Sequence, residues 1–454
     1  MDKTFEKIAE APAVALEMGI EASRNAFENI KTHEHLGKPL KYWDDLGPGI
    51  TTGASDDDPS GIATYSQAGA QYGFQLLWLA GFTFPLMAVV QEMCARLGLV
   101  TGRGLAANIR RHYPRWVLYA CTFLLFVANT LNIGADLGAM AKATQLLAPQ
   151  WSFLWLIIGF TVLSLGLQIF IPYGRYAKYL KYLALILLAY VFSAFMTKLD
   201  FNKLLTSAVI PSLTFSKDQI ILVCGILGTT ISPYLFFWQT SQEVEEEIQK
   251  GKVTIQLRQG TTEEEVRKMR KDVWSGMFLS NVVMFFIIAA CAATLFAAGI
   301  TNIATAEDAA KALRPLAGEQ AYLLFAIGVI GAGLLAVPVL AGSASYAISE
   351  SFGWKFGLHK LLKEAYSFYG VIMFSMVIGL LINFIGFDPI KALIYSAVAN
   401  GLVAPVMLVL IVLMSSNKKI MGERANHPVI TFFGWLITGI MVVAGAATLF
   451  SFFI

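Results

Sequence analysis

Apolar residues in this chain gather in runs of about 20 that are separated by shorter polar segments. A run of this length can cross the hydrocarbon core of a bilayer as a helix. We therefore expect eleven membrane-spanning segments. Their approximate limits are 47–71, 74–100, 116–147, 151–171, 178–197, 219–241, 274–299, 320–347, 366–385, 389–414 and 428–453.

Polar residues interrupt the first of these segments near its middle. Residues 51–61 read TTGASDDDPSG, and apolar residues resume directly afterwards. Pro59 removes a backbone donor and opposes helix formation, and a carboxylate at bilayer depth costs roughly 3 kcal/mol. We interpret the segment as a helix that is broken near the membrane midplane, with carboxylates at the break.

The sixth segment has a matching interruption. Residues 225–234 read GILGTTISPY, in which glycines, hydroxyl residues and Pro233 again disturb an apolar run. Interrupted helices in corresponding positions are typical of inverted-repeat transporters and of their substrate sites. We expect repeats over about 46–197 and 219–414, followed by an extra helix at 428–453. Two unrelated proline kinks are the alternative.

The composition agrees with an all-α polytopic membrane protein. Of the 454 residues, 56% are hydrophobic and 14% are charged, whereas a soluble domain carries about 25% charged residues. With the N-terminus inside, 26 of the 34 Lys and Arg residues fall in inner segments and five in outer connections. Because basic residues concentrate on the cytoplasmic side, we expect a cytoplasmic N-terminus and an outer C-terminus. The expected location is the bacterial plasma (inner) membrane.

Two polar regions lie outside the predicted transmembrane segments. Residues 1–45 form a cytosolic tail in which apolar residues recur at helical spacing, and this predicts an amphipathic helix. Residues 242–273, rich in Glu, Lys and Arg, are expected to form a partly helical inner loop whose charges face solvent. The four cysteines lie in apolar runs without metal-binding spacing, so we interpret them as buried thiols.

The first break supplies the candidate cation ligands. Asp58 is the principal candidate, and Asp56 and Asp57 are expected to line the same cavity. Asp58 could instead cap a half-helix, and Asp56 and Asp57 could instead cap the break or pair elsewhere. Unwound carbonyl groups and the electronegative ends of half-helices also favour a cation at this point. Carboxylate, carbonyl and water oxygens suit Mg²⁺, Ca²⁺ or Mn²⁺.

The residues at both breaks resemble the motifs of the NRAMP divalent-metal transporters. Asp58-Pro59-Ser60-Gly61, preceded by Gly47-Pro48-Gly49, is similar to the first-helix motif Asp-Pro-Gly-Asn of that family. Ser232-Pro233-Tyr234 is similar to its sixth-helix motif Met-Pro-His. The resemblance implies a leucine-transporter-type fold with a five-plus-five inverted repeat and an eleventh helix. It also implies that the Ser55 and Thr229 carbonyls and the Ser232 hydroxyl are metal ligands beside Asp58.

Some positions depart from the family motifs in ways that bear on selectivity and coupling. The Asn of the first-helix motif aligns with Gly61, and the Met of the sixth-helix motif aligns with Ser232. A thioether favours softer transition metals, so a hydroxyl in a larger cavity favours a partly hydrated Mg²⁺. Side chains that could relay protons in the family are also replaced: its sixth-helix histidines align with Tyr234 and Gln239, and its third-helix acids align with Asn132 and Ala135. The ninth segment also lacks arginine, where the family has basic residues. This pattern resembles the NRAMP-related magnesium transporter branch.

We therefore expect a membrane transporter, not an enzyme, that imports divalent cations by alternating access. Mg²⁺ and Mn²⁺ are the expected substrates, without proton coupling, because an inside-negative potential of about 100 mV supplies roughly 4.6 kcal/mol for a divalent ion. The alternatives are a proton-coupled Mn²⁺/Fe²⁺ symporter that uses Asp136 and a sodium-coupled amino-acid carrier of the same fold. Apart from the transported cation and the lipid bilayer, we expect no cofactor, no nucleic acid and no obligatory protein partner.

Other polar residues inside the segments each have two interpretations. Glu92 and Arg96, spaced i, i+4, are interpreted as a structural ion pair and not as a relay. Asp136 either carries a proton or metal ion or, as we favour, is bonded to a neighbouring helix. Gln67 and Gln71 could line the outer vestibule or could equally pack near the surface, and Asn400 could face the site.

Overall fold

The computed structural model describes residues 42–43, 46–197, 199–301, 303, 306–385 and 389–451. The chain separates into two units, Met1–Gly47 and Pro48–Ile454. The amphipathic helix predicted for the tail lies outside the described residues, so that prediction stays open.

The described part of the second unit consists of helices joined by short connections, with no strand among its described residues. In chain order the α-helices are α3 (Pro48–Asp56), α4 (Pro59–Tyr72), α5 (Trp78–Thr101), α6 (Leu105–His112), α7 (Arg115–Leu147), α8 (Phe153–Phe170), α9 (Tyr173–Leu183), α10 (Leu188–Phe195), α11 (Phe201–Val209), α12 (Lys217–Thr230), α13 (Pro233–Gln249), α14 (Ile255–Arg258), α15 (Glu263–Cys291), α16 (Ala306–Phe352), α17 (Tyr366–Ile382), α18 (Pro389–Ser416), α19 (Lys418–Met421) and α20 (Pro428–Ser451). Short 3₁₀ or π turns are η1 (Gly73–Leu76), η2 (Ala184–Leu187), η3 (Ala292–Phe296), η4 (Leu362–Glu364) and η5 (Gly422–Arg424).

Both predicted helix breaks are present. The first separates α3 from α4 at Asp57 and Asp58, and the second separates α12 from α13 at Ile231 and Ser232. Each second half begins with a proline, at the helix start where a missing N–H costs no helical hydrogen bond. The prolines that predicted the breaks therefore also set where the second halves begin.

Nine helical stretches in the described part of the chain are long and apolar enough to cross a membrane. α17 adds a shorter apolar helix, and α3 with α4 covers the first predicted segment. Each predicted segment thus coincides with helix, although α13 and α16 extend well beyond the predicted limits. The number of spans, the repeat boundaries and the orientation stay predictions.

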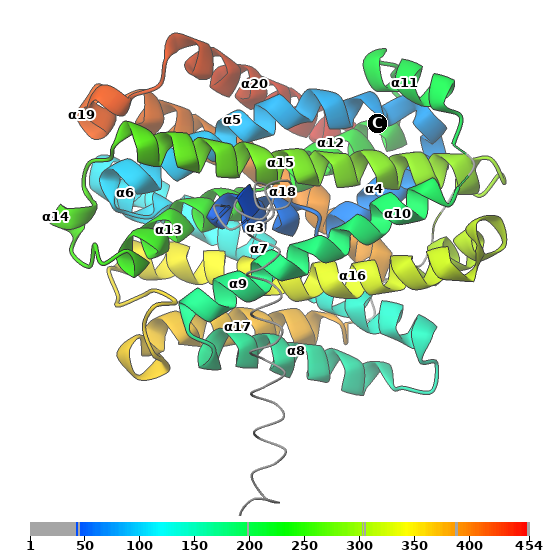
Figure 1. Ribbon diagram of the computed structural model, residues 1–454, viewed down its shortest axis with the longest axis horizontal. Helices are drawn as coiled ribbons and strands as arrows, with labels where there is room; N and C mark the ends of the chain where they lie inside the picture. The colour runs from blue at the N-terminus through cyan, green and yellow to red at the C-terminus, as the bar shows by residue number, and fades with distance from the viewer. Residues whose placement is uncertain are drawn as a thin grey trace, which may run out of the picture. The chain divides into compact units, whose positions relative to one another are not determined.

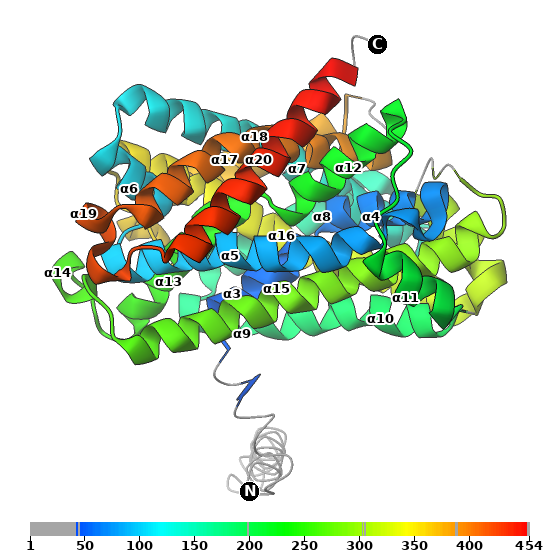
Figure 2. The same ribbon diagram turned by 90° about the horizontal axis from the view of Figure 1, so that it is seen from above.

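Long helices surround the two short halves of the first broken helix. Figure 1 shows α5, α15 and α16 running along the long axis of the view, with α3 between α15 and α16. α7 packs against α16, α17 and α18, and α8 lies beside α17 at one edge. In Figure 2, α20 lies diagonally across α5 and α18. The broken helices are therefore enclosed, and lipid-facing helices such as α8 and α20 lie outside them.

α3 packs against α15 at backbone distance. A side-chain carbon at Gly53 would overlap the backbone of Gly276, and one at Gly276 would overlap the carbonyl oxygen of Gly49. Asp272 caps the start of α3, because its carboxylate oxygens accept hydrogen bonds from Gly49 N at 2.7 Å and Ile50 N at 3.1 Å. Glycine permits the close approach, and a carboxylate suits the electropositive end of a helix. α15 thus holds α3 through both packing and charge.

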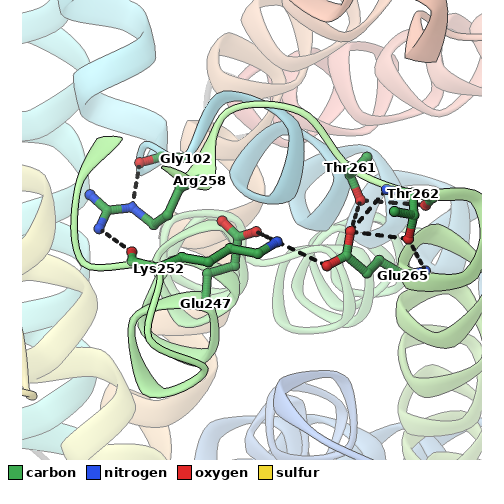
Figure 3. A network of polar contacts seen from close by, with 7 residues as sticks. All are labelled: Gly102, Glu247, Lys252, Arg258, Thr261, Thr262 and Glu265. Carbon is green, nitrogen blue, oxygen red and sulfur yellow. Dashed lines mark hydrogen bonds and ion pairs between the residues drawn. The ribbon is translucent and has the colours of Figure 1, made fainter. Parts of the chain in front are cut away.

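Helix covers most of the segment 242–273, which is partly helical as expected, because α13 and α15 extend into it from both sides. The expectation that its charges face solvent is wrong for five residues that are buried, Glu243, Glu245, Glu247, Arg258 and Asp272. Lys252 Nζ lies 3.0 Å from Glu247 Oε1 and 2.8 Å from Glu265 Oε1 (Figure 3). These charges lie between packed elements and are paired there, which offsets the cost of removing them from water.

The Glu92–Arg96 ion pair is present, with 3.9 Å between Oε1 and Nη1, but it belongs to a larger cluster. Arg270 donates to Glu92 Oε1 from Nε at 2.9 Å and from Nη2 at 2.8 Å. Trp274 Nε1 donates to Glu92 Oε2 at 2.9 Å. The carboxylate therefore joins α5 to α15, in agreement with the structural interpretation.

Gly276→Ala should destabilise the protein, because the added carbon overlaps α3 and overpacking costs about 1–3 kcal/mol. Gly439→Ala is the matched control, since no atom lies within 4 Å of the added carbon on α20. That variant should be neutral or gain up to about 1 kcal/mol from helix propensity. Thermal unfolding of the purified protein in detergent measures both effects. Equal midpoints in the two variants would contradict the close contact between α3 and α15.

Candidate functional site

The two breaks lie in direct contact inside the helix bundle. The Tyr234 hydroxyl at the start of α13 donates a hydrogen bond to the Ser55 carbonyl near the end of α3 at 2.6 Å. The hydroxyl oxygens of Tyr65 on α4 and Thr230 at the end of α12 lie 3.2 Å apart. All four residues are buried. The structure thus brings together two segments that lie far apart in the sequence, as their matching interruptions predicted.

Asp58 lies between the halves of the first broken helix and caps the second half. Its Oδ1 accepts hydrogen bonds from the Gly61 amide at 2.7 Å and from the Ser60 hydroxyl at 2.6 Å. This is the usual arrangement of an aspartate at the start of a helix. The capping alternative is therefore realised for Asp58, and any role as a metal ligand would be additional to it.

The other oxygen of Asp58 is linked to α7 and α18. Asn132 Nδ2 donates to Asp58 Oδ2 at 2.7 Å, and Asn132 Oδ1 accepts from the Ser396 hydroxyl at 2.6 Å. All three side chains are buried. Asn132 was considered from sequence only as the replacement of an acid, so its role as a partner of Asp58 was missed. The available signal was its alignment with a proton-carrying position of the family.

The other predicted ligands form hydrogen bonds with protein groups. The Ser55 carbonyl accepts from Tyr234, as described above. The Thr229 carbonyl accepts from the Ser232 hydroxyl at 2.7 Å, and the same hydroxyl lies 2.7 Å from the Gly228 carbonyl. The carbonyl oxygens of Ser55 and Thr229 and the Ser232 hydroxyl are therefore all occupied by hydrogen bonds within the protein. A cation that bound to them would replace hydrogen bonds that the protein makes with itself.

Asp56 and Asp57 retain carboxylate oxygens without partners. Ser280 on α15 donates to Asp56 Oδ2 at 2.6 Å, but Asp56 Oδ1 and both oxygens of Asp57 make no hydrogen bond of normal geometry with a described residue. The Thr229 hydroxyl is likewise unpartnered, and it lies 3.0 Å from the position of a side-chain carbon at Gly61. Buried polar groups are nearly always paired. These oxygens are therefore the groups at the breaks that most require a cation or a proton.

Asp136 and Asn400 are buried near the same helices. Asp136 interacts electrostatically with Asp58 and with the Ser60 amide of α4, but its oxygens lack hydrogen bonds of normal geometry to described residues. The favoured prediction of a bond to a neighbouring helix therefore stays a prediction. Asn400 lies on α18, which packs against α4 and α12, and its amide has no hydrogen-bond partner among the described residues. Its place facing the site stays a prediction.

Gln67 and Gln71 pack against the connection that precedes α16. Gln67 Nε2 donates to Gln71 Oε1 at 3.1 Å, and Gln67 Oε1 accepts from the Ile303 amide at 3.2 Å. Gln67 is buried and Gln71 is partly buried. These contacts favour the packing interpretation over a place in an outer vestibule.

The breaks present oxygen groups and not a preformed cluster of metal ligands. No group of three or more His, Cys, Asp or Glu side chains that could hold a metal ion is found in the part of the chain that the structure describes. The thioether of Met284 lies 3.9 Å from the Thr230 hydroxyl, beside the second break. Met284 was missed from sequence because it lies on α15, outside both motifs. The arrangement suits a hard cation held by carboxylate, hydroxyl and carbonyl oxygens, with one soft sulfur nearby.

A sequence model of the family described as natural resistance-associated macrophage protein-like (Nramp) matches residues 49–451. Two relatives, each named divalent metal cation transporter MntH, come from two strains of Klebsiella pneumoniae. Each is 28% identical over 406 residues, which cover 87% of this chain and 91% of the relative.

Solved transporter structures share the fold. A manganese transporter of Eremococcus coleocola superposes with a TM-score of 0.69 at 18% identity, over 91% of this chain and 87% of that chain. Mhp1, a nucleobase-cation-symport-1 family transporter in a closed conformation, gives a TM-score of 0.55 at 16% identity, over 89% of this chain and 91% of that chain. The predicted leucine-transporter-type fold is thereby confirmed. Because the family model matches nearly the whole of the helical unit, the chain belongs to the Nramp family.

Proposed function

We propose that this Nramp family member imports divalent metal cations across the membrane by alternating access. The Klebsiella relatives are named as divalent metal cation transporters, and the Eremococcus protein is named as a manganese transporter. The same class of substrate suits the buried oxygen groups of this chain. The protein acts as a transporter and not as an enzyme in this proposal.

The observation that carries the proposal is the set of unpartnered carboxylate oxygens on Asp56 and Asp57. Both residues are fully buried where the two breaks meet. An unpaired carboxylate away from water is costly, and a divalent cation can offset the charge of more than one. The carbonyl-bearing ends of α3 and α12 lie at the same breaks and add to the attraction for a cation.

We propose Mg²⁺ as a main substrate, with Mn²⁺ also carried. Ser232 stands where the family motif has methionine, so the second break presents a hydroxyl in place of a thioether. Gly61 stands where the motif has asparagine, and a side chain there would crowd the Thr229 hydroxyl. In the closed arrangement a carbon at this position would lie 3.0 Å from the Thr229 hydroxyl and 3.2 Å from the Asp56 carbonyl oxygen, so room for water there would have to arise when the site opens. Mg²⁺ gives up its waters reluctantly and usually keeps several, so an opened site with oxygen ligands suits it.

Transport requires the closed site to open to one side of the membrane at a time. The hydrogen bonds of Asp58 to Ser60 and Gly61 lie within α4, whereas its bond to Asn132 reaches α7. We expect Asp58 to move together with α4, because the bonds within one helix survive a rigid movement of that helix. The bond to Asn132 would then be exchanged for water or for the cation during opening.

A proton-coupled Mn²⁺/Fe²⁺ symporter is the second candidate, and Asp136 is the residue that favours it. This carboxyl group is buried within electrostatic reach of Asp58, so it could carry a proton. A sodium-coupled amino-acid carrier has less support, because the three acids at the first break would repel the carboxylate of its substrate.

Asp58→Asn should separate the charge of this residue from its capping role. Asparagine caps helices about as well as aspartate, so the variant should keep the thermal midpoint of the parent. Loss of the charge should reduce Mg²⁺ uptake into proteoliposomes by about tenfold or more. Asp58→Ala should also lose about 0.5–2 kcal/mol of stability with the cap. Asp218→Asn, at an exposed residue of α12, is the control. Normal uptake by Asp58→Asn would remove Asp58 from the site.

Ser232→Met should shift selectivity toward Mn²⁺, because a thioether favours softer metals. Ser232→Ala removes the hydroxyl without adding sulfur, and it should leave the ratio of Mn²⁺ to Mg²⁺ uptake close to that of the parent. Competition between the two ions for uptake into proteoliposomes measures this ratio. The same ratio in all three proteins would exclude a role of this position in selectivity.

Mg²⁺ uptake should proceed without a change in internal pH, and a more negative interior should speed it. A potential of about 100 mV supplies roughly 4.6 kcal/mol for a divalent ion. Proteoliposomes that contain a pH dye, with the potential set by a potassium gradient, measure both properties. Acidification that scales with metal uptake and disappears in Asp136→Asn would support the symporter instead.

A further inference from the structure

A cavity of about 670 Å³ lies at the end of the bundle that is predicted to face the cytoplasm. Its walls come from the connection between α5 and α6, from α6, α13 and α14, and from the end of α16 with the segment that follows it. This volume falls within the range of small-molecule sites, roughly 300–1,000 Å³. No residue at either helix break lines the cavity, so the proposed transport site does not account for it.

Both carboxylates that line the cavity are engaged by protein groups. Glu245 accepts a hydrogen bond from the Tyr346 hydroxyl at 2.6 Å, and its other oxygen lies 2.7 Å from His359 Nδ1. Glu350 accepts from the Ala107 amide at 2.9 Å, in the first turn of α6. These acids hold the walls together. They are therefore only partly available to balance the basic residues around the cavity.

Arg258 is also committed to the wall (Figure 3). Its guanidinium donates to the carbonyls of Gly102 at 3.3 Å and Lys252 at 3.0 Å. The ammonium of Lys252 lies between Glu247 and Glu265, as described above. The connection that carries α14 is thus fixed to α5, α13 and α15, and it forms a defined side of the cavity.

The other basic residues around the cavity are less closely balanced by carboxylates. None of them forms an ion pair with a described acidic residue; they are Arg103, Arg110, Arg111, Lys355 and Lys360. Burial and the positive charge of Arg111 lower the pKa of Arg103, and the negative charge of Glu350 only partly opposes this shift. Burial, Arg111 and Arg103 likewise lower the pKa of the adjacent His112. These shifts indicate a positive potential that a bound anion would relieve.

We propose that this cavity binds a phosphate-bearing anion. Guanidinium groups pair with phosphate oxygens through parallel hydrogen bonds, and lysines add point charges. Trp354 and Phe356 line the same cavity. One face of Trp354 stacks on Phe352, with ring centroids 5.1 Å apart, but the side chain is still 40% exposed, so a base can stack on its other face. A soluble nucleotide and an anionic lipid headgroup both carry the required phosphate.

Occupation of the cavity would act on α13, the second half of the second broken helix. α13 contributes Ser241 and Glu245 to the cavity, and it begins at the break itself. A ligand that bridges α6 and α13 would bind one arrangement of these helices better than another and would shift the balance between them. This regulatory consequence rests on the proposed transport function, whereas the binding of the anion does not.

Calorimetric titration of the full-length protein in detergent tests the proposal. Pyrophosphate and ATP, each with EDTA present, probe the soluble source, and short-chain phosphatidic acid probes the lipid source. Arg111→Gln and Lys360→Gln should each weaken binding about tenfold. Arg115→Gln and Lys363→Gln change exposed neighbours that do not line the cavity, so both should bind as the parent does.

Binding of pyrophosphate or ATP that follows this pattern identifies a soluble phosphate ligand, and binding of phosphatidic acid alone with the same pattern identifies a headgroup. No saturable binding of any probe, or equal binding by all four variants, overturns the proposal. Thermal midpoints equal to that of the parent keep lost binding distinct from lost folding. Because the titration contains no metal gradient, its outcome is independent of whether the protein transports Mg²⁺.

Discussion

Backbone groups that are freed by a break inside the membrane must find partners within the protein, and this constraint organises the bundle. The two broken helices meet it largely through each other and through their own caps. The carbonyl of Ser55 at the end of α3 is satisfied by Tyr234 from the start of α13. Asp58 satisfies the first turn of α4, and Ser232 satisfies the last carbonyls of α12. Each break is thus partly satisfied by its own cap and partly by the other break, through Tyr234 and Ser55 and through Tyr65 and Thr230.

The three consecutive acids at the first break have unequal surroundings. Asp58 accepts from an amide, a hydroxyl and a side-chain amide, whereas Asp57 has no such partner among the described residues. One carboxylate thus shapes the break, and its neighbours hold the unsatisfied charge. In the transport that we propose, this division would let the backbone keep its form while the ion that balances the charge is exchanged.

Structural features that depend on a short stretch of residues could be predicted from the sequence. Acids, proline and glycine at 57–61 identify the first break, and glycine, hydroxyl residues and proline at 228–233 identify the second. The apolar runs identify the helices around them. Partnerships between distant segments could not be predicted, because nothing near Asn132 or Asp272 in the chain specifies which helix end each will meet. The acidic residues around Glu245 were predicted to face solvent because their partners also lie far away in the sequence. Composition does not reveal that α16 supplies a tyrosine hydroxyl to one of them.

The contact between α3 and α15 limits how the protein can open. α3 has nine residues and is about 13 Å long, so a tilt of about 20° would carry one end through about 5 Å, enough to admit water. We do not expect α3 to tilt alone, because Gly49, Gly53 and Gly276 place the backbones of α3 and α15 in contact. In addition, Asp272 on α15 accepts hydrogen bonds from the first turn of α3. We therefore expect α3 and α15 to move as one rigid unit. An opening that moves α3 would be a rotation of both helices, with the hinge of the first broken helix at Asp57, and not the release of one short half-helix.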